Sequence, residues 1–186
     1  TLWRRSTTGS ASSPTVADLT TVGVVLPVPA PHQELLDRYR TDVAGHAPET
    51  PAHITLVPPT DVATPSLPAV IEHLGAVARG SSPFDVVVRG TGSFRPLTPV
   101  VYLDVVAGAD DCGRLAVRTG SGPLTSPARF PYHPHVTLAH HVSDPELDAA
   151  MADWAHFEAG WQAASFTLYE YTAPQWSAVR SFPLGR

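Results

Sequence analysis

The sequence predicts an α+β fold of two lobes, made by duplication of one unit and arranged around a central cleft. The first observation is a tetrad that occurs twice, as HITL at residues 53–56 and as HVTL at residues 135–138. The second is that the segments around one tetrad recur around the other at an offset of about 80 residues. The third is that β-branched, extended segments alternate with amphipathic ones, so both strands and helices are expected.

Each tetrad has the composition of a strand, because it reads His, β-branched aliphatic, Thr, Leu. Successive side chains of a strand point to opposite faces. The imidazole and the hydroxyl therefore share one face, and the two aliphatic side chains share the other. Two such walls, one carrying His53 and Thr55 and the other His135 and Thr137, can face each other across a cleft.

The first half of the chain begins with a predicted buried strand and continues with alternating elements. In order, these are a strand at 20–28, a helix at 31–44, the strand of the first tetrad, a helix from 66 to 80 and a strand at 84–94. Gly45 is expected to stop the first helix, and Pro58-Pro59 to end the tetrad strand. Ser66 is expected to cap the second helix.

The second half repeats this pattern. The predicted elements are a strand at 100–106, a short helix capped by Asp110 or Asp111, a loop at 120–127, the strand of the second tetrad, a helix, and closing strands at 164–172 and 178–184. Ser143 and Glu146 have the spacing of a capping box for the last helix.

An internal duplication of about 80 residues is the simplest account of these offsets. Each copy is expected to contribute a small sheet backed by helices, and a pseudo-twofold axis would bring the two tetrads together. Strand–helix alternation by itself would also fit a parallel α/β sheet. Residues 1–18 are Ser/Thr-rich and without periodicity, so we expect a flexible tail followed by a single bilobal domain at 19–186, with repeats at about 20–95 and 99–184.

Composition excludes several classes of function. Twelve basic residues against 17 acidic ones give a formal charge of −5, which argues against tracking the backbone of long duplex nucleic acid. No run approaches the roughly 18 apolar residues of a membrane span, and no stretch reads well as a signal peptide, so a cytoplasmic protein without a membrane partner is expected. The lone Cys112 cannot form an internal disulfide.

Two His-x-Thr-Leu motifs at duplicated positions resemble the two-histidine (2H) phosphoesterase superfamily, and within it the bacterial RNA 2′,5′-ligase and cyclic phosphodiesterase-like branch. The resemblance covers roughly residues 20–184 and includes PHVTLAH around the second motif and the closing FTLYEY…FPLG segment. It implies two antiparallel sheets with outer helices around the cleft. It also implies metal-independent cleavage of cyclic phosphodiesters or transfer at RNA ends.

Carried over by position, the resemblance makes His53 and His135 the catalytic pair and Thr55 and Thr137 the phosphate-binding hydroxyls. Imidazole suits general acid–base work because its ordinary pKa of about 6.5 leaves both protonation states available near neutrality. Threonine hydroxyls can donate hydrogen bonds to the non-bridging oxygens, where charge builds up.

Further residues are candidates for substrate binding. Arg129 could hold phosphate or form a loop salt bridge. Phe94, Tyr102 and Tyr132 could stack on a base, or pack in the core or at the rim of the cleft. His133 shares the face of the second motif and could line the cleft or lie at its rim.

A metal site built from His133, His135 and His141 is an alternative, which requires the second motif strand to stay regular as far as His141. No Asp or Glu lies near these residues in the segment, and the spacing matches no recognised zinc motif. We therefore expect no metal and no cofactor.

The function that we expect is hydrolysis of a 2′,3′-cyclic phosphate on a small nucleotide or an RNA terminus, by a monomer. Two alternatives stay open. One is 2′,5′ RNA ligation and its reversal in the same cleft. The other is a non-catalytic module that binds RNA ends or nucleotides.

Overall fold

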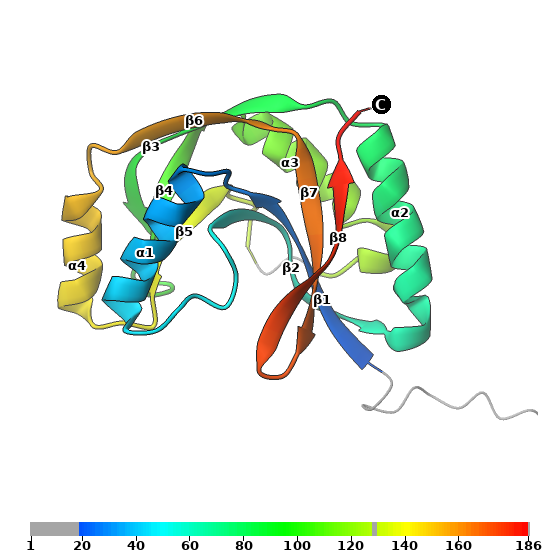
Figure 1. The fold of residues 1–186 in the computed structure, drawn as a ribbon, viewed down its shortest axis with the longest axis horizontal. Helices are drawn as coiled ribbons and strands as arrows, with labels where there is room; N and C mark the ends of the chain where they lie inside the picture. The colour runs from blue at the N-terminus through cyan, green and yellow to red at the C-terminus, as the bar shows by residue number, and fades with distance from the viewer. Residues whose placement is uncertain (1–18, 128–129, 186) are drawn as a thin grey trace, which may run out of the picture.

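The computed structural model describes residues 19–127 and 130–185 of the 186-residue chain (Figure 1). The predicted tail at 1–18 and the candidate Arg129 lie outside these ranges. The strands are β1 (Leu19–Pro27), β2 (His53–Ala63), β3 (Phe84–Ser93), β4 (Val100–Ala107), β5 (His135–His140), β6 (Glu158–Ala163), β7 (Ser165–Thr172) and β8 (Gln175–Pro183). The helices are α1 (His32–Ala44), α2 (Leu67–Arg79), α3 (Ala109–Thr119) and α4 (Asp144–Asp153), with short 3-10 turns at Thr64–Ser66 and Gly122–Leu124.

The strands pair in the order β6-β3-β4-β5-β2-β1-β7-β8, and every pairing is antiparallel. The antiparallel α+β fold is therefore confirmed. The eight strands form one sheet, not the two expected from the resemblance, because β5 lies beside β2 and joins two four-stranded halves through a single residue pair, Ile54 with Val136. This one-pair ladder is the only strand pairing between the two halves within the described residues.

The helices cover the two halves in pairs. Helices α1 and α4 lie together, where the Tyr39 and Trp154 rings meet edge to face at 5.1 Å, and α4 packs on β4 and β5 (Figure 1). Helices α2 and α3 contact each other and pack on β8 and β2, respectively. The apolar side chains between these layers form one core, which includes the fully buried Val24, Ile54, Leu103, Val136 and Phe166.

The two halves of the sheet do not each come from one repeat, as the duplication suggested. β3, from the first repeat, pairs with β4 and β6, whereas β7 and β8, from the end of the chain, return to β1. Only residues 94–99 connect β3 to β4, and strands joined by so short a loop become antiparallel neighbours. The repeats therefore exchange strands, and this exchange ties the lobes together.

Two strand predictions were wrong. β2 continues through Pro58-Pro59 to Ala63, because the register with β1 slips between Val22 and Val24 and the resulting bulge accommodates the prolines. β6 was missed, because its sequence EAGWQA is not strand-like and the strand is held by six residue pairs with β3.

The helix ends agree with the sequence in part. Ser66 precedes α2 as predicted, but its side chain makes no cap hydrogen bond. Ser143 and Glu146 form the expected capping box of α4. The predicted cap of α3 by Asp110 or Asp111 was wrong, because Gly108 is the cap and the two aspartates lie in the first turn of the helix. Among residues 19–127 and 130–185, no helix is long and apolar enough to cross a membrane.

Candidate active site

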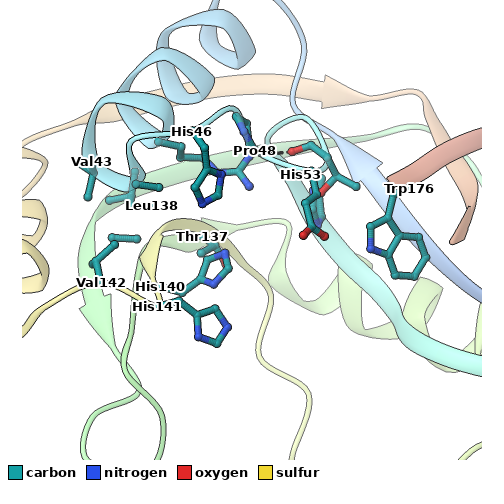
Figure 2. A pocket seen from close by; sticks show the side chains of 15 residues that line it. Val43, His46, Pro48, His53, Thr137, Leu138, His140, His141, Val142 and Trp176 are labelled. Carbon is teal, nitrogen blue, oxygen red and sulfur yellow. Dashed lines mark hydrogen bonds between the residues drawn. The ribbon is translucent and has the colours of Figure 1, made fainter. Parts of the chain in front are cut away.

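The two motifs lie on adjacent strands, β2 and β5, where the two halves of the sheet join. The antiparallel pair Ile54–Val136 sets the register, so His53 stands opposite Thr137, and Thr55 stands opposite His135. Ile54 and Val136 are fully buried on one face, and the four polar side chains share the other face, as the strand pattern predicts. His53 and Thr137 line a cavity of about 460 Å³ (Figure 2).

Both imidazoles are oriented by the same hydrogen bond. Nδ1 of His53 is 2.6 Å from the carbonyl oxygen of Pro51, and Nδ1 of His135 is 2.7 Å from that of His133. A carbonyl can only accept, so Nδ1 carries the proton in each ring. Nε2 is then the lone-pair nitrogen of the neutral imidazole, and it is the atom left for chemistry.

His53 is held through the backbone of the loop that precedes it. Oδ1 of Asp37 on α1 accepts the backbone N–H of Ala52 at 2.8 Å, and Nη1 of Arg40 donates to the carbonyl oxygen of Thr50 at 3.0 Å. Asp37 and Arg40 are themselves an ion pair at 3.0 Å, with side chains 19% and 11% exposed. The helix therefore fixes residues 50–52, whose Pro51 carbonyl orients the His53 ring.

His135 is held by aromatic rings. The rings of Tyr102 and Phe94 lie 5.2 and 4.9 Å from the His135 ring, and they lie 4.4 Å from each other. The His133 ring is roughly parallel to the His135 ring at 6.1 Å, and its Nε2 lies 3.2 Å from Oδ1 of Asp104. The aromatic cluster thus positions His135 from one side.

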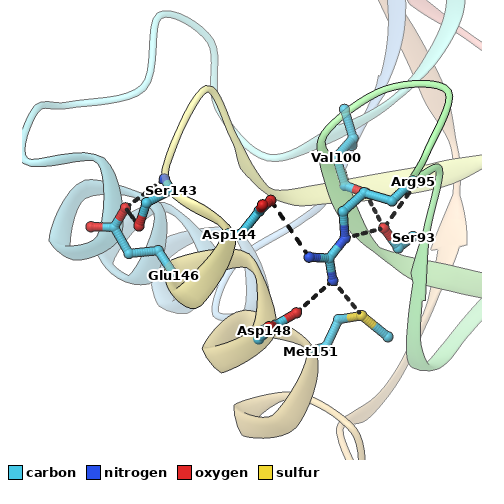
Figure 3. A network of polar contacts seen from close by, with 8 residues as sticks. All are labelled: Ser93, Arg95, Val100, Ser143, Asp144, Glu146, Asp148 and Met151. Carbon is cyan, nitrogen blue, oxygen red and sulfur yellow. Dashed lines mark hydrogen bonds and ion pairs between the residues drawn. The ribbon is translucent and has the colours of Figure 1, made fainter.

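The loop that carries Phe94 is anchored to α4 (Figure 3). Arg95 donates from Nη2 to Asp148 at 2.7 Å, and its Nη1 lies 3.8 Å from Asp144. The Arg95 Nε–H also donates to the Ser93 hydroxyl at 3.3 Å, at the end of β3. These contacts fix the loop and therefore the ring of Phe94 beside His135.

Burial is the main influence on the pKa values of the two catalytic candidates, His53 and His135. It lowers the pKa of both His53 and His135 from the ordinary imidazole value. Positive charge on Arg40 and His135 lowers the pKa of His53 further, whereas the Pro51 carbonyl and Asp37 raise it. For His135, charge on His133 lowers the pKa, and the His133 carbonyl and Asp104 raise it.

The remaining candidates take different places. Tyr102 is buried and packs on His135, so it is a supporting residue and not an exposed stacking surface. Tyr132 reaches across the junction, and its hydroxyl donates to the carbonyl oxygen of Thr55 at 3.1 Å. Phe94 and His133 lie in the cluster around His135.

The cavity also holds residues that the sequence did not single out. Besides His53 and Thr137 it is lined by Arg40, His46, Glu49, His140, His141 and Trp176. β5 ends at His140, and His141 has a left-handed backbone with φ of 57°, so the strand does not stay regular. Asp104 was missed too, although its place in VVYLDVV, two residues after Tyr102, signals a polar face.

The metal alternative finds no support in the geometry. Within the described ranges, no three His, Cys, Asp or Glu side chains converge as metal ligands would. His133 and His135 are near each other, but His141 has turned away with the end of β5 and lines the cavity with His140.

Comparisons with known proteins agree with this arrangement. A family model described as the 2′-5′ RNA ligase superfamily matches residues 27–175. A protein of Bacillus licheniformis named "Putative phosphoesterase" is 24% identical over 166 residues, covering 88% of this chain and 98% of the relative. A protein of the same name from Halalkalibacterium halodurans is 24% identical over 169 residues, covering 88% and 97%.

Solved structures share the fold. E. coli LigT complexed with 3′-AMP superposes with a TM-score of 0.68 at 20% identity, covering 90% of this chain and 99% of LigT. TT0787 of Thermus thermophilus gives a TM-score of 0.63 at 21% identity, covering 89% and 99%. Because the family model spans most of the chain and its paired motifs lie together in the shared fold, the chain belongs to the 2′-5′ RNA ligase superfamily, the two-histidine phosphoesterases that its sequence resembles.

Proposed function

We propose that this chain is a metal-independent phosphodiesterase that hydrolyses 2′,3′-cyclic phosphates on nucleotides or RNA ends. One observation carries the proposal: two imidazoles on adjacent strands share a sheet face, and each has Nδ1 bonded to a carbonyl so that Nε2 is left for proton transfer. Family and fold support a phosphoesterase at the coarser level.

The reaction requires two proton transfers. A water oxygen attacks phosphorus while one Nε2 accepts the water proton. The bond from phosphorus to one ribose oxygen breaks, and the Nε2–H of the other imidazole, protonated beforehand, gives its proton to that oxygen. The attacking and leaving oxygens lie roughly in line, on opposite sides of phosphorus. A base on one wall of a cleft and an acid on the other can therefore each reach one of the two oxygens. Both transfers are served by imidazoles, and the proposal needs no metal.

The threonines complete the site. Each stands across the strand junction from the other motif's histidine, so a phosphate between the imidazoles would meet a hydroxyl from each wall. In the parts of the chain that the structure describes, neither the Thr55 nor the Thr137 hydroxyl has a protein hydrogen-bond partner. Both can therefore donate to non-bridging oxygens, whose charge rises in the transition state.

A small nucleotide is a reasonable substrate for such a site. LigT has been crystallised with 3′-AMP. A nucleoside 3′-phosphate is one of the two products that opening a 2′,3′-cyclic phosphate can give. Arg129, which flanks the second motif in sequence, is retained as a candidate for phosphate binding.

Ligation is the second candidate function, and the family description favours it. In the ligase direction, the 5′-hydroxyl of a second RNA end replaces water as the nucleophile, the bond from phosphorus to the ribose 3′ oxygen breaks, and that oxygen takes a proton from the acid, so the two histidines keep their roles. RNA fragments with 2′,3′-cyclic phosphate and 5′-hydroxyl ends distinguish the two reactions, because ligation gives a longer product with a 2′,5′ linkage and hydrolysis gives a phosphomonoester.

The decisive experiment measures turnover of a panel of nucleoside 2′,3′-cyclic phosphates in the presence of EDTA. We expect wild-type turnover to survive the chelator, and His53→Ala and His135→Ala each to lose at least about 100-fold in kcat, as positioned acids and bases typically contribute 10²–10⁴-fold. His156→Ala, an exposed histidine on the turn after α4, is the matched control and should keep wild-type rates.

The outcomes separate the alternatives. Turnover abolished by EDTA would overturn the metal-independent reaction. Wild-type protein that opens no cyclic phosphate but joins RNA ends would assign the ligase. Wild-type protein that does neither, yet binds nucleotides equally well after His135→Ala, would identify a binding module.

A further inference from the structure

The cavity that contains His53 and Thr137 extends into a second group of polar side chains. His46 comes from the loop between α1 and β2, and His140 and His141 come from the end of β5. In Figure 2 these three imidazoles lie to one side of His53, and Trp176 lies to the other. The proposed reaction uses none of the three.

The backbone brings two of these imidazoles into the same cavity. Consecutive side chains of a strand point to opposite faces, so a regular strand would place only one of His140 and His141 there. The left-handed conformation of His141 breaks the alternation, and both rings line the cavity at 4.7 Å from each other. Such a conformation is uncommon for a residue other than glycine and is found disproportionately at functional sites.

Charges from several elements converge on this part of the cavity. His141, Arg40 and His46 present positive charge to His140, and Glu49 presents negative charge. Arg40 also lines the cavity, and among the described residues its hydrogen bonds all leave from Nη1. Its Nε and Nη2 remain as donors for a ligand.

We propose that Arg40, His46, His140 and His141 bind a second phosphate group of the substrate, apart from the cyclic phosphate held between the two motifs. The ligand class is a nucleotide with a further phosphate, either a 5′-phosphate on the same nucleoside or the phosphodiester that links the preceding nucleotide of an RNA end. This inference rests on the proposed function, because it extends the same substrate away from His53 and Thr137.

Imidazole donors and a guanidinium suit a phosphate better than a metal or an uncharged group. Arginine and protonated histidine form short, charge-assisted hydrogen bonds to phosphate oxygens. No set of these side chains has metal-ligand geometry within the described ranges. The proposal also gives the unusual concentration of histidine after the second motif a chemical role.

Binding of this phosphate is coupled to proton uptake. Nδ1 of His46 lies 3.0 Å from the Ala47 carbonyl oxygen and therefore carries the proton, so Nε2 donates to an anion only once the ring is protonated. The charged and titratable groups that line the cavity with the cluster are Arg40 from α1, Glu49 from the following loop and His53 from β2, and Asp37 is the ion-pair partner of Arg40. Asp37 and Glu49 oppose an anion, so protonated imidazoles are required for net attraction.

The test measures binding, which does not depend on turnover. Isothermal titration calorimetry compares adenosine 3′-phosphate with adenosine 3′,5′-bisphosphate and with a diadenosine nucleotide that ends in a 3′-phosphate. We expect the second phosphate to improve Kd about tenfold near pH 6 and less than about threefold near pH 8, because the protonated fraction of an imidazole falls as the pH rises. The dinucleotide is the cleaner probe of pH, because its phosphodiester keeps one charge throughout.

Variants locate the effect. The double variant His46→Gln/His140→Gln should abolish the advantage of the second phosphate, expressed as the ratio of two Kd values measured on the same protein. The matched control His156→Gln changes an exposed histidine outside the cavity and should leave both the ratio and its pH dependence unchanged.

Each outcome is informative. An advantage for the bisphosphate alone assigns a 5′-phosphate, and an advantage for the dinucleotide alone assigns the phosphodiester. A ratio near one for both ligands near pH 6, or an advantage that survives in the double variant, overturns the second phosphate site. The wild-type protein could fail to hydrolyse any cyclic phosphate and still bind the ligand with a second phosphate more tightly. If the double variant then loses this gain in affinity, the proposed reaction fails and the phosphate site stands.

Discussion

His53 and His135 occupy equivalent positions in β2 and β5, and each has Nδ1 bonded to the carbonyl of the residue two positions earlier. Their surroundings are nevertheless unlike. His53 depends on a charged helix, where Asp37 and Arg40 hold the loop before it. His135 depends on the packed rings of Phe94 and Tyr102.

The difference shows what a duplicated motif conserves and what it leaves open. In both His-x-Thr strands the local backbone gives the same hydrogen bond, from Nδ1 to the carbonyl two residues earlier. It also places the imidazole and the hydroxyl on the same face of the strand. The remainder of each site comes from distant segments. α1 precedes β2 and holds the loop before His53, whereas Tyr102 on β4, the strand beside β5, and Phe94 just after β3 pack on His135. Two equal tetrads thus place two imidazoles in unequal electrostatic environments, as an acid and a base require.

Among the residues that support the two histidines, the largest expected effect on catalysis is on the charged side of the comparison. Asp37→Asn replaces a carboxylate that accepts from Ala52, Arg40 and Gln33 by an amide, and it leaves the Arg40 guanidinium without its ion-pair partner. We expect a loss of about 2 kcal/mol in the free energy of unfolding, because breaking a mostly buried ion pair leaves an uncompensated charge. We also expect roughly a tenfold fall in kcat/KM, because a misplaced catalytic group is costly.

Urea denaturation and steady-state kinetics check this prediction. Asp42→Asn is the control, since Asp42 lies on the same helix with an exposed side chain. Full activity in a destabilised Asp37→Asn protein would show that the loop before His53 does not depend on α1 for its catalytic geometry.

The aromatic side of the comparison is tested through a glycine. Gly92 pairs with Tyr102 across β3 and β4, and a Cβ built on Gly92 would lie 2.6–2.7 Å from three atoms of the Tyr102 side chain. Gly92→Ala therefore displaces the ring that packs on His135. We expect a loss of about 1–3 kcal/mol in stability from overpacking, and about a fivefold fall in kcat/KM.

Gly160→Ala is the matched control, because Gly160 lies in β6 of the same sheet and an added Cβ there meets its nearest neighbour at an ordinary 3.5 Å. Circular dichroism melts and the same kinetic assay distinguish the two substitutions. Equal effects from both would mean that the Tyr102 ring has no special part in positioning His135.

Part of this organisation could be predicted from the sequence, because it is local. The strands of the two tetrads, the shared face of His and Thr, and the Ser143–Glu146 capping box follow from rules that act over a few residues. The resemblance to a known family supplied the antiparallel sheets and the pairing of the two histidines.

The rest depends on contacts between distant segments. His46 and His140 line one cavity although 94 positions separate them, because α1 packs on β5 and β2 pairs with β5. β6 exists because β3 offers it a free edge, since its own sequence has weak strand propensity. The predicted end of β2 at Pro58-Pro59 failed for a related reason, because a bulge against β1 tolerates residues that a regular ladder would not.

The smallest expected effect concerns the pH dependence of catalysis. One histidine must be protonated and the other neutral, so kcat/KM should follow a bell whose limbs are the two apparent pKa values of the pair. Burial lowers both pKa values in the free enzyme, so the maximum should lie below pH 6.5, the ordinary imidazole value. An anionic substrate favours the protonated form, so the maximum of kcat should lie at higher pH than that of kcat/KM.

Asp104→Asn then assigns a limb of the bell to a residue. The Asp104 carboxylate favours the protonated form of His135, so its removal lowers the pKa of His135 and moves one limb to lower pH, with less than about a threefold change at the maximum because Asp104 is about half exposed. If the acidic limb moves, His135 is the residue that must be neutral and acts as the base in hydrolysis. If the alkaline limb moves, His135 is the acid and His53 the base. An unchanged profile would show that neither limb belongs to His135, and the two-histidine mechanism would then be wrong at this motif.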